Sequence, residues 1–100
     1  MSGRQYEVFM APSAHRRFKK FNSAVQKKVK EEAEKLSVEP NACEELKGPL
    51  KGIRSWHFDF RKTQYRIAFR VLEDKKQIEI VLVDSRENFY QILRKIVGPR

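Results

Sequence analysis

The chain has 100 residues, a length that suits one domain over residues 1–100 and leaves no room for a second hydrophobic core. Lys and Arg number 22 against 13 Asp and Glu, giving a formal net charge of +9, while 40% hydrophobic residues exclude an intrinsically disordered chain. No apolar run could cross a bilayer, and Arg4 and Glu7 interrupt the first ten residues, so we expect no signal-peptide core there. A single cysteine excludes an internal disulfide and a cysteine-cluster metal site. We therefore expect a cytoplasmic protein that contacts no membrane.

The positive charge is concentrated in two stretches of the chain. Residues 4–30 carry eight basic and one acidic side chain, and residues 46–70 carry seven basic and one acidic. Residues 31–45 between them carry six acidic and one basic. Because such a field attracts polyanions, we expect contact with nucleic acid, although charge alone does not separate RNA, DNA, a ribosome or an acidic protein.

The N-terminal part of the chain is predicted to form one strand and two helices. Residues 6–10 alternate in the manner of a strand that stops at Pro12, where a short helix opens. Ser23 and Gln26 fit a capping box, so a second helix is predicted to begin there. Because only two or three residues join the helices, they must fold back as an antiparallel pair. Their apolar positions are Ala14, Phe18 and Phe21 in the first, and Val25, Val29, Ala33 and Leu36 in the second.

A loop, three strands and a last helix are predicted to follow. Residues 37–52 contain two prolines and two glycines without a sustained period, as a loop does. Apolar and polar residues then alternate over 56–61, 65–71 and 78–83, and the short connections between these stretches predict an antiparallel meander. The last helix runs from about Arg86 to Val97. The predicted fold class is therefore α+β, with helices packed on one face of a four-stranded sheet.

The alternation divides this sheet into an apolar and a basic face. The helix pair must cover the apolar face, which contains Trp56, Phe58, Phe60, Tyr65, Ile67, Phe69, Ile78, Ile80 and Leu82. The opposite face surrounds a small apolar centre of Ala68, Val81 and Val83 with His57, Asp59, Arg61, Arg66 and Arg70. We expect this second face to be an open, concave surface suited to a phosphate backbone.

Four segments of the chain, taken in order, carry a resemblance to a known family. They are residues 6–14 with the basic helix pair behind them, Leu-Lys-Gly-Pro-Leu-Lys-Gly at 46–52, Tyr-Arg-Ile-Ala-Phe at 65–69 and Arg-Glu-Asn-Phe-Tyr at 86–90. Together they resemble the RelE/ParE superfamily of toxins from type II toxin–antitoxin systems, from about Tyr6 to about Tyr90. The chain departs from the family pattern at Ser85, where many members have histidine. It also departs at His57 and Asp59, where ribosome-dependent RelE toxins carry lysines.

This resemblance implies an endoribonuclease that cleaves mRNA, in association with the ribosome, without a metal or another cofactor. The RNA's own 2′-hydroxyl attacks the adjacent phosphorus and leaves a 2′,3′-cyclic phosphate, while the protein orients the chain, moves protons and stabilises charge. The implied partners are mRNA, the ribosome and a cognate antitoxin. Two alternatives are a ParE-like inhibitor of DNA gyrase, which is not an enzyme, and an inactive relative that only binds nucleic acid or the ribosome.

Four residues are candidates for catalysis. Arg66 offers phosphate a planar guanidinium, and Arg86 at the start of the last helix is expected to reach the same surface. Tyr90, one turn later, would stack on a base or relay a proton, and the imidazole of His57 suits proton transfer near neutrality. The simpler alternatives are an ion pair of Arg66 with Asp59, and an ion pair of Arg86 with Asp84 or Glu87. For the other two candidates they are a core position for Tyr90 and a solvated His57. The nuclease hypothesis requires both guanidinium groups to share one hollow that packed side chains leave open.

The remaining cations of the basic face and its border are expected to contact phosphates without reading sequence. They are Lys47, Lys51, Arg54, Arg61 and Arg70. A solvated surface is the alternative for each of them. Asp59 could orient His57 or accept a proton, but we expect it to form an ion pair with Arg66 or Arg61 instead, and we assign Cys43 no role.

Overall fold

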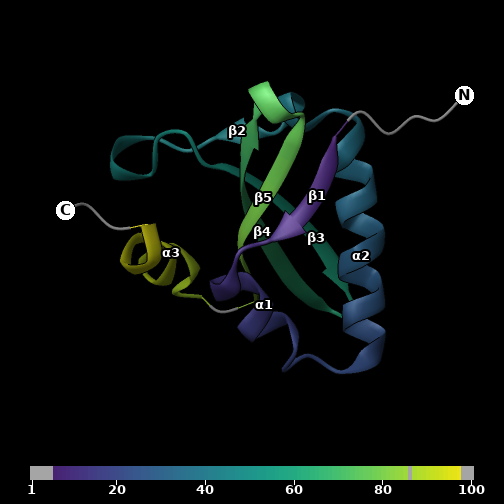
Figure 1. Cartoon of the computed structure of the whole chain (residues 1–100). Coiled ribbons are helices and arrows are strands. Elements are labelled where there is room, and N and C mark those ends of the chain that lie inside the picture. The colour runs from purple at the N-terminus through teal and green to yellow at the C-terminus, as the bar shows by residue number, and fades with distance from the viewer. Residues whose placement is uncertain (1–5, 86, 98–100) are drawn as a thin grey trace, which may run out of the picture.

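The computed structural model describes residues 6–85 and 87–97, and the elements in these residues follow the predicted order (Figure 1). The α-helices and strands are β1 (Glu7–Met10), α1 (Pro12–Phe18), α2 (Ser23–Val38), β2 (Glu44–Glu45), β3 (Arg54–Phe60), β4 (Thr63–Leu72), β5 (Gln77–Asp84) and α3 (Phe89–Val97). Three short 3-10 turns complete the list: η1 (Pro40–Ala42), η2 (Gly48–Leu50) and η3 (Glu73–Lys75). The α+β class is confirmed. In the described part of the chain, no helix has the length and apolar character needed to span a membrane.

The sheet has the strand order β1-β5-β4-β3-β2. The meander of β3, β4 and β5 is antiparallel as predicted, and β1 runs parallel to β5. The prediction of four strands is wrong, because Glu44 and Glu45 pair with Ser55 and Arg54 as a fifth strand inside the predicted loop. Two exposed glutamates at a sheet edge give no alternation of apolar and polar residues, so the sequence pattern could not reveal β2.

Helix α2 begins at Ser23, and its N-terminus is capped by the side chain of Asn22, not by that of Ser23 as predicted. The Asn22 side-chain oxygen accepts a hydrogen bond from the Val25 backbone N–H at 3.0 Å, so Asn22 is the N-cap and the predicted capping box is wrong. Gln26 instead donates to the backbone carbonyls of Phe18 and Phe21, at 3.2 and 3.0 Å. Gln26 therefore ties α2 to the end of α1, which fixes the turn between the two helices.

The first hydrophobic cluster fills the space between the sheet and α2. Helix α2 contributes Val25, Val29 and Leu36 from the predicted stripe. All the residues predicted for the apolar face lie in or against this cluster except Leu82, and Val83 takes part although it was assigned to the other face. Burial of one such large side chain contributes about 1.5–3 kcal/mol, so this cluster is the main source of stability.

A β-bulge in β5 explains why Leu82 and Val83 exchange faces. Ala68 pairs with Leu82, but the next residue, Phe69, pairs with Ile80, so Val81 is an extra residue in β5. Such an insertion reverses the alternation of side chains beyond it. Leu82 therefore faces away from α2, whereas Val83 is fully buried against it. The run from Ile78 to Val83 is so apolar that its sequence does not mark the bulge.

The second face of the sheet is covered at its centre by α3, which lies across the sheet from α2 (Figure 1). Phe89 and Leu93, four residues apart on α3, are fully buried. The other members of this second cluster are Leu50, Ile53, Ala68, Val81 and Leu82. The prediction that all helices lie on one face is therefore wrong, and the expected open hollow is filled at its centre. Polar side chains lie at both ends of this face, with His57 and Arg66 at one end and Arg70 and Glu79 at the other.

Candidate functional site

At the end of the second face that carries Arg66, side chains from β3, β4 and α3 lie together. We call Ser55, His57, Arg66 and Tyr90 the Arg66 cluster. Ser55 and His57 lie on β3 opposite Ala68 and Arg66 of β4, and residues directly opposite in an antiparallel ladder point to the same side of the sheet. Tyr90 follows the buried Phe89, so the packing of α3 places the Tyr90 ring at the border of this end.

Arg66 lies against the ring of Tyr90. The Arg66 guanidinium carbon is 5.7 Å from the Tyr90 ring centroid, within cation–π range, and both side chains are half-buried. The Tyr90 hydroxyl is 3.5 Å from Ser55 Oγ on β3, and its ring meets that of Phe89 edge-on at 5.2 Å. Within residues 6–85 and 87–97, no carboxylate forms an ion pair with Arg66. The guanidinium is therefore held by an aromatic ring, and no carboxylate of the described residues forms an ion pair with it.

His57 is exposed and lies directly opposite Arg66 in the β3–β4 ladder. Its imidazole is therefore open to a ligand that contacts Arg66. Three of the four predicted catalytic residues come together in this way. The fourth, Arg86, lies outside the described residues.

The prediction that Asp59 forms an ion pair with Arg66 or Arg61 is wrong. Asp59 is exposed and faces Gln64, and among the described residues no ion pair joins it to Arg66 or Arg61. Arg66 extends toward Tyr90 instead, and the Arg61 guanidinium lies 5.0 Å from the centroid of the Phe60 ring. Arg61 also occupies the hairpin turn, with a φ of 53°, rather than strand β3.

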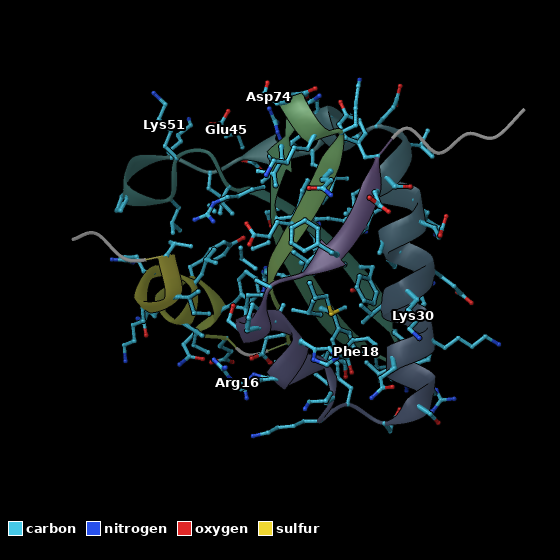
Figure 2. The ribbon with its side chains drawn as sticks, viewed as in Figure 1. Arg16, Phe18, Lys30, Glu45, Lys51 and Asp74 are labelled. Carbon is cyan, nitrogen blue, oxygen red and sulfur yellow. The ribbon has the colours of Figure 1, made fainter. Side chains whose placement is uncertain are left out.

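The other predicted phosphate-binding residues divide into two groups. Lys47 and Lys51 are exposed on the loop that carries η2, where Lys51 projects outward (Figure 2). Arg70 and Arg54 are instead engaged within the protein. Arg70 lies 3.3 Å from Glu79 on β5, and Arg54 donates to the backbone carbonyl of Cys43 at 2.6 Å. Arg54 therefore fastens the β2 segment to β3, a role that its sequence position did not reveal.

Glu32 of α2 fixes β3 from behind the Arg66 cluster. This buried carboxylate accepts a hydrogen bond from the Trp56 indole N–H at 2.8 Å and pairs with Lys28 at 3.1 Å and Lys35 at 3.0 Å. Burial raises the pKa of Glu32, but the bonds from Trp56, Lys35 and Lys28 outweigh it and hold the pKa below its ordinary value. Since Trp56 lies between Ser55 and His57, this contact fixes the strand that carries both residues.

A second polar contact borders the Arg66 cluster on the side of α1. Asp84, at the end of β5, is buried, and its Oδ2 lies 2.9 Å from Arg17 Nε. Its Oδ1 accepts a hydrogen bond from the Ser85 backbone N–H at 2.7 Å. Sequence reasoning did not single out Arg17 or Ser55, and it considered Asp84 only as an ion-pair partner of Arg86, because it placed no bulge in β5 and had no signal for which side chains meet α3.

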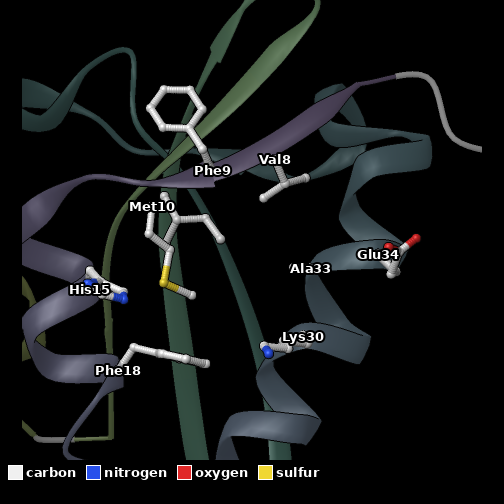
Figure 3. A pocket seen from close by; sticks show the side chains of 9 residues that line it. Val8, Phe9, Met10, His15, Phe18, Lys30, Ala33 and Glu34 are labelled. Atoms are coloured by element: carbon white, nitrogen blue, oxygen red, sulfur yellow. The ribbon is translucent and has the colours of Figure 1, made fainter.

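A separate groove lies between β1, α1 and α2 (Figure 3). It has a volume of about 670 Å³ and is lined by Val8, Phe9, Met10, His15, Phe18, Lys30, Ala33, Glu34 and Ile80. No member of the Arg66 cluster lines it. Within the described residues, no three His, Cys, Asp or Glu side chains gather in a way that could hold a metal ion.

Comparison with known proteins matches residues 8–94 to the family described as ParE-like toxin of type II bacterial toxin-antitoxin system. Among solved structures, a chain of the toxin–antitoxin complex RelBE2 from Mycobacterium tuberculosis is 30% identical with a TM-score of 0.69, over 82% of this chain and 99% of that chain. The isolated RelE toxin of E. coli is similar in fold at 19% identity and a TM-score of 0.64, over 91% and 98% of the two chains. An arginine-to-alanine double variant of E. coli RelE in the free state has a TM-score of 0.71 at 19% identity, over 93% and 95%. A search of curated proteins found no match.

Proposed function

This chain belongs to the ParE-like toxins of type II bacterial toxin–antitoxin systems, within the RelE/ParE superfamily, and we propose that it acts as a RelE-like endoribonuclease on mRNA. The observation that carries the proposal is Arg66, a half-buried guanidinium held against Tyr90, opposite His57 and without a carboxylate partner in the described chain. A fixed, uncompensated guanidinium beside a polar, open surface suits a phosphate that gains negative charge during reaction.

In the proposed reaction, the 2′-oxygen of the RNA forms a bond to the adjacent phosphorus as the bond to the 5′-oxygen breaks. Arg66 stabilises the additional charge on the phosphate oxygens, and His57 takes part in moving the proton from the 2′-hydroxyl toward the leaving 5′-oxygen. The products are a 2′,3′-cyclic phosphate and a free 5′-hydroxyl, so the step needs no metal and no other cofactor. The ring of Tyr90 holds Arg66 and offers a face on which a base can stack. Arg86 is retained as a second guanidinium on the family resemblance alone.

The proposed partners follow from the same surface. Lys47, Lys51 and Arg61 are exposed cations that would contact RNA phosphates, on mRNA held in the ribosome. Arg54 and Arg70 are left out of this group, because contacts within the protein already engage them. As a toxin of a type II pair, the protein has a cognate antitoxin partner, and complexes of this kind are known for RelBE from M. tuberculosis and E. coli. The proposed site of action is the cytoplasm.

Primer extension on transcripts, after induction of the toxin in cells, tests this function. Wild type should produce new 5′ ends within coding regions, and Arg66→Ala should reduce cleavage by about 10²-fold or more, the usual cost of losing one charge-stabilising group. The matched control is Arg16→Ala, which removes an exposed arginine of α1 outside the Arg66 cluster (Figure 2). Purified protein with ribosomes should cleave mRNA equally well in the presence of EDTA. Wild-type cleavage by Arg66→Ala would contradict the assignment of the site.

A second function has support from the family match, whose description names ParE. In that case the protein would inhibit DNA gyrase by binding it, without an enzymatic step of its own. A supercoiling assay with purified gyrase separates the two proposals. Inhibition of supercoiling together with intact mRNA would favour the ParE-like function, and cleaved mRNA with active gyrase would favour the nuclease.

A further inference from the structure

Arg66 and Asp84 face each other in the β4–β5 ladder but do not pair. Oppositely charged residues directly opposite on antiparallel strands lie close enough to attract each other, and such pairs stabilise sheets. Here the Arg66 guanidinium lies 5.7 Å from the Tyr90 ring centroid, while the Asp84 carboxylate lies 2.9 Å from Arg17 Nε. No ion pair of the described residues joins Arg66 to Asp84. Asp84 is therefore paired with Arg17 and not with the arginine that lies opposite it in the ladder.

The β-bulge at Val81 accounts for the position of Asp84. Without the extra residue, strict alternation from Ile80 would direct Asp84 into the aromatic core against α2. The bulge turns it to the side of Arg66, where it is only 4% exposed. A carboxylate this deeply buried needs a cation close by, because an uncompensated buried charge is strongly destabilising.

Helix α1 supplies one cation to Asp84 and is itself bonded to the strand at the bulge. The Ser13 hydroxyl donates to the backbone carbonyl of Val81 at 2.8 Å, and Arg17, one helical turn later, reaches Asp84. Arg17 is half-buried, unlike its exposed neighbour Arg16. Helix α1 thus covers the part of β5 that extends beyond β1 and brings one guanidinium to the end of that strand.

We propose that Arg17 is a positioning residue of the Arg66 cluster: by holding Asp84, it keeps Arg66 free to bind an anionic phosphate. The inference rests on the proposed nuclease function. Loss of the Arg17 charge removes one cation from Asp84, and Arg66 lies directly opposite Asp84 in the ladder. Arg66 then turns from Tyr90 to the carboxylate, its charge is neutralised, and Asp84 repels the phosphate. Arg17 acts on the reaction only through these two residues.

The test compares Arg17→Gln, Arg17→Lys, Asp84→Asn and the double variant Arg17→Gln/Asp84→Asn. The direct readout is the Nε–Hε NMR signal of Arg66, assigned by its loss in Arg66→Lys and recorded without RNA. We expect this signal to shift in Arg17→Gln and to return in the double variant, where no carboxylate remains to capture Arg66. Arg17→Lys should keep the wild-type signal. Circular dichroism and thermal unfolding show whether each variant is folded.

Cleavage of ribosome-bound mRNA by the same variants gives the second readout. Arg17→Gln should lose about tenfold in rate, as expected for coupled neighbouring charges, and the double variant should recover most of that loss. A merely structural ion pair would also allow recovery in the double variant, so the Arg66 NMR signal in folded Arg17→Gln is the measurement that distinguishes the two roles. An unchanged Arg66 signal in folded Arg17→Gln, or a double variant as slow as Arg17→Gln, would overturn the inference. If wild type does not cleave RNA, the proposed function fails, and the NMR result still shows whether Arg17 keeps Asp84 from Arg66.

Discussion

The two faces of the sheet differ in how they are filled. The face toward α2 is a continuous aromatic and aliphatic layer that includes Phe58, Ile67 and Phe69. The face toward α3 has a smaller apolar centre, with Ala68 in its middle, and ends in the polar Arg66 cluster. The α2 face therefore provides most of the stability, whereas the α3 face is where a guanidinium can stay uncompensated.

This difference shows how the molecule separates folding from chemistry. Removal of a side chain from the α2 face should cost stability before it affects any reaction. Removal of a side chain from the Arg66 cluster should affect activity at nearly constant stability, because half-buried and exposed groups contribute little to the core. The following predictions test that separation, from the largest expected effect to the smallest.

The largest effect is expected from Phe69→Ala on the α2 face. Phe69 is fully buried, so its truncation leaves a cavity and should lower the free energy of unfolding by about 3–5 kcal/mol. Urea unfolding measures this change. The control is Val38→Ala at an exposed position of α2, where the loss should stay below about 1 kcal/mol. Equal losses in the two variants would show that the aromatic layer does not dominate stability.

Two substitutions of Tyr90 should distinguish the role of its ring from the role of its hydroxyl in the Arg66 cluster. If the ring holds Arg66, Tyr90→Phe should retain most cleavage, and Tyr90→Ala should reduce it by about 10–100-fold through loss of the cation–π contact and of base stacking. Both variants should unfold at urea concentrations close to wild type. A large loss in Tyr90→Phe would instead assign the hydroxyl, which lies 3.5 Å from Ser55 Oγ, a part in proton transfer.

Glu32 should make stability depend on pH. Its folded-state pKa lies below the ordinary value of an unfolded chain, so its carboxylate stabilises the fold above the unfolded pKa, and this stabilisation is lost as the pH falls through the folded pKa. The free energy of unfolding of wild type should therefore decrease on acidification more than that of Glu32→Gln. Identical pH profiles of the two proteins would show that the contact with Trp56 does not favour the ionised form.

The smallest effect is expected at the β3–β4 hairpin, away from both clusters. Arg61 and Lys62 have φ values of 53° and 66°, a left-handed conformation that two-residue turns require and that glycine adopts without strain. Lys62→Gly should raise the free energy of unfolding by roughly 0.5–1 kcal/mol. Lys75→Gly in η3, where φ is not positive, serves as a control that should not stabilise. Destabilisation by Lys62→Gly would show that the turn is not strained.

The regular alternation of apolar and polar residues in β3 and β4 is what allows the sequence to predict the α2 face and the two site residues on these strands, His57 and Arg66. In β3 and β4, aromatic residues alternate with polar ones, so Trp56 and Ile67 are assigned to the core and His57 and Arg66 to the opposite face. In β5, the apolar run hides the bulge, so Leu82 and Val83 are assigned to the wrong faces and Asp84 is not placed opposite Arg66. The sequence pattern also cannot predict the position of α3. Phe89 and Leu93 show that one face of this helix is buried, but not against which side of the sheet.

The most direct measurement of the central claim is the chemistry of the cleaved RNA end. Wild-type toxin should cut a ribosome-bound mRNA to leave a 2′,3′-cyclic phosphate, which mass spectrometry of the fragment identifies. Arg66→Ala should leave the same mRNA intact, and wild type should not cut a substrate with a single 2′-deoxy nucleotide at the cleavage position. Cleavage of that substrate at the normal rate, or an mRNA left whole by folded wild-type toxin, would contradict the account.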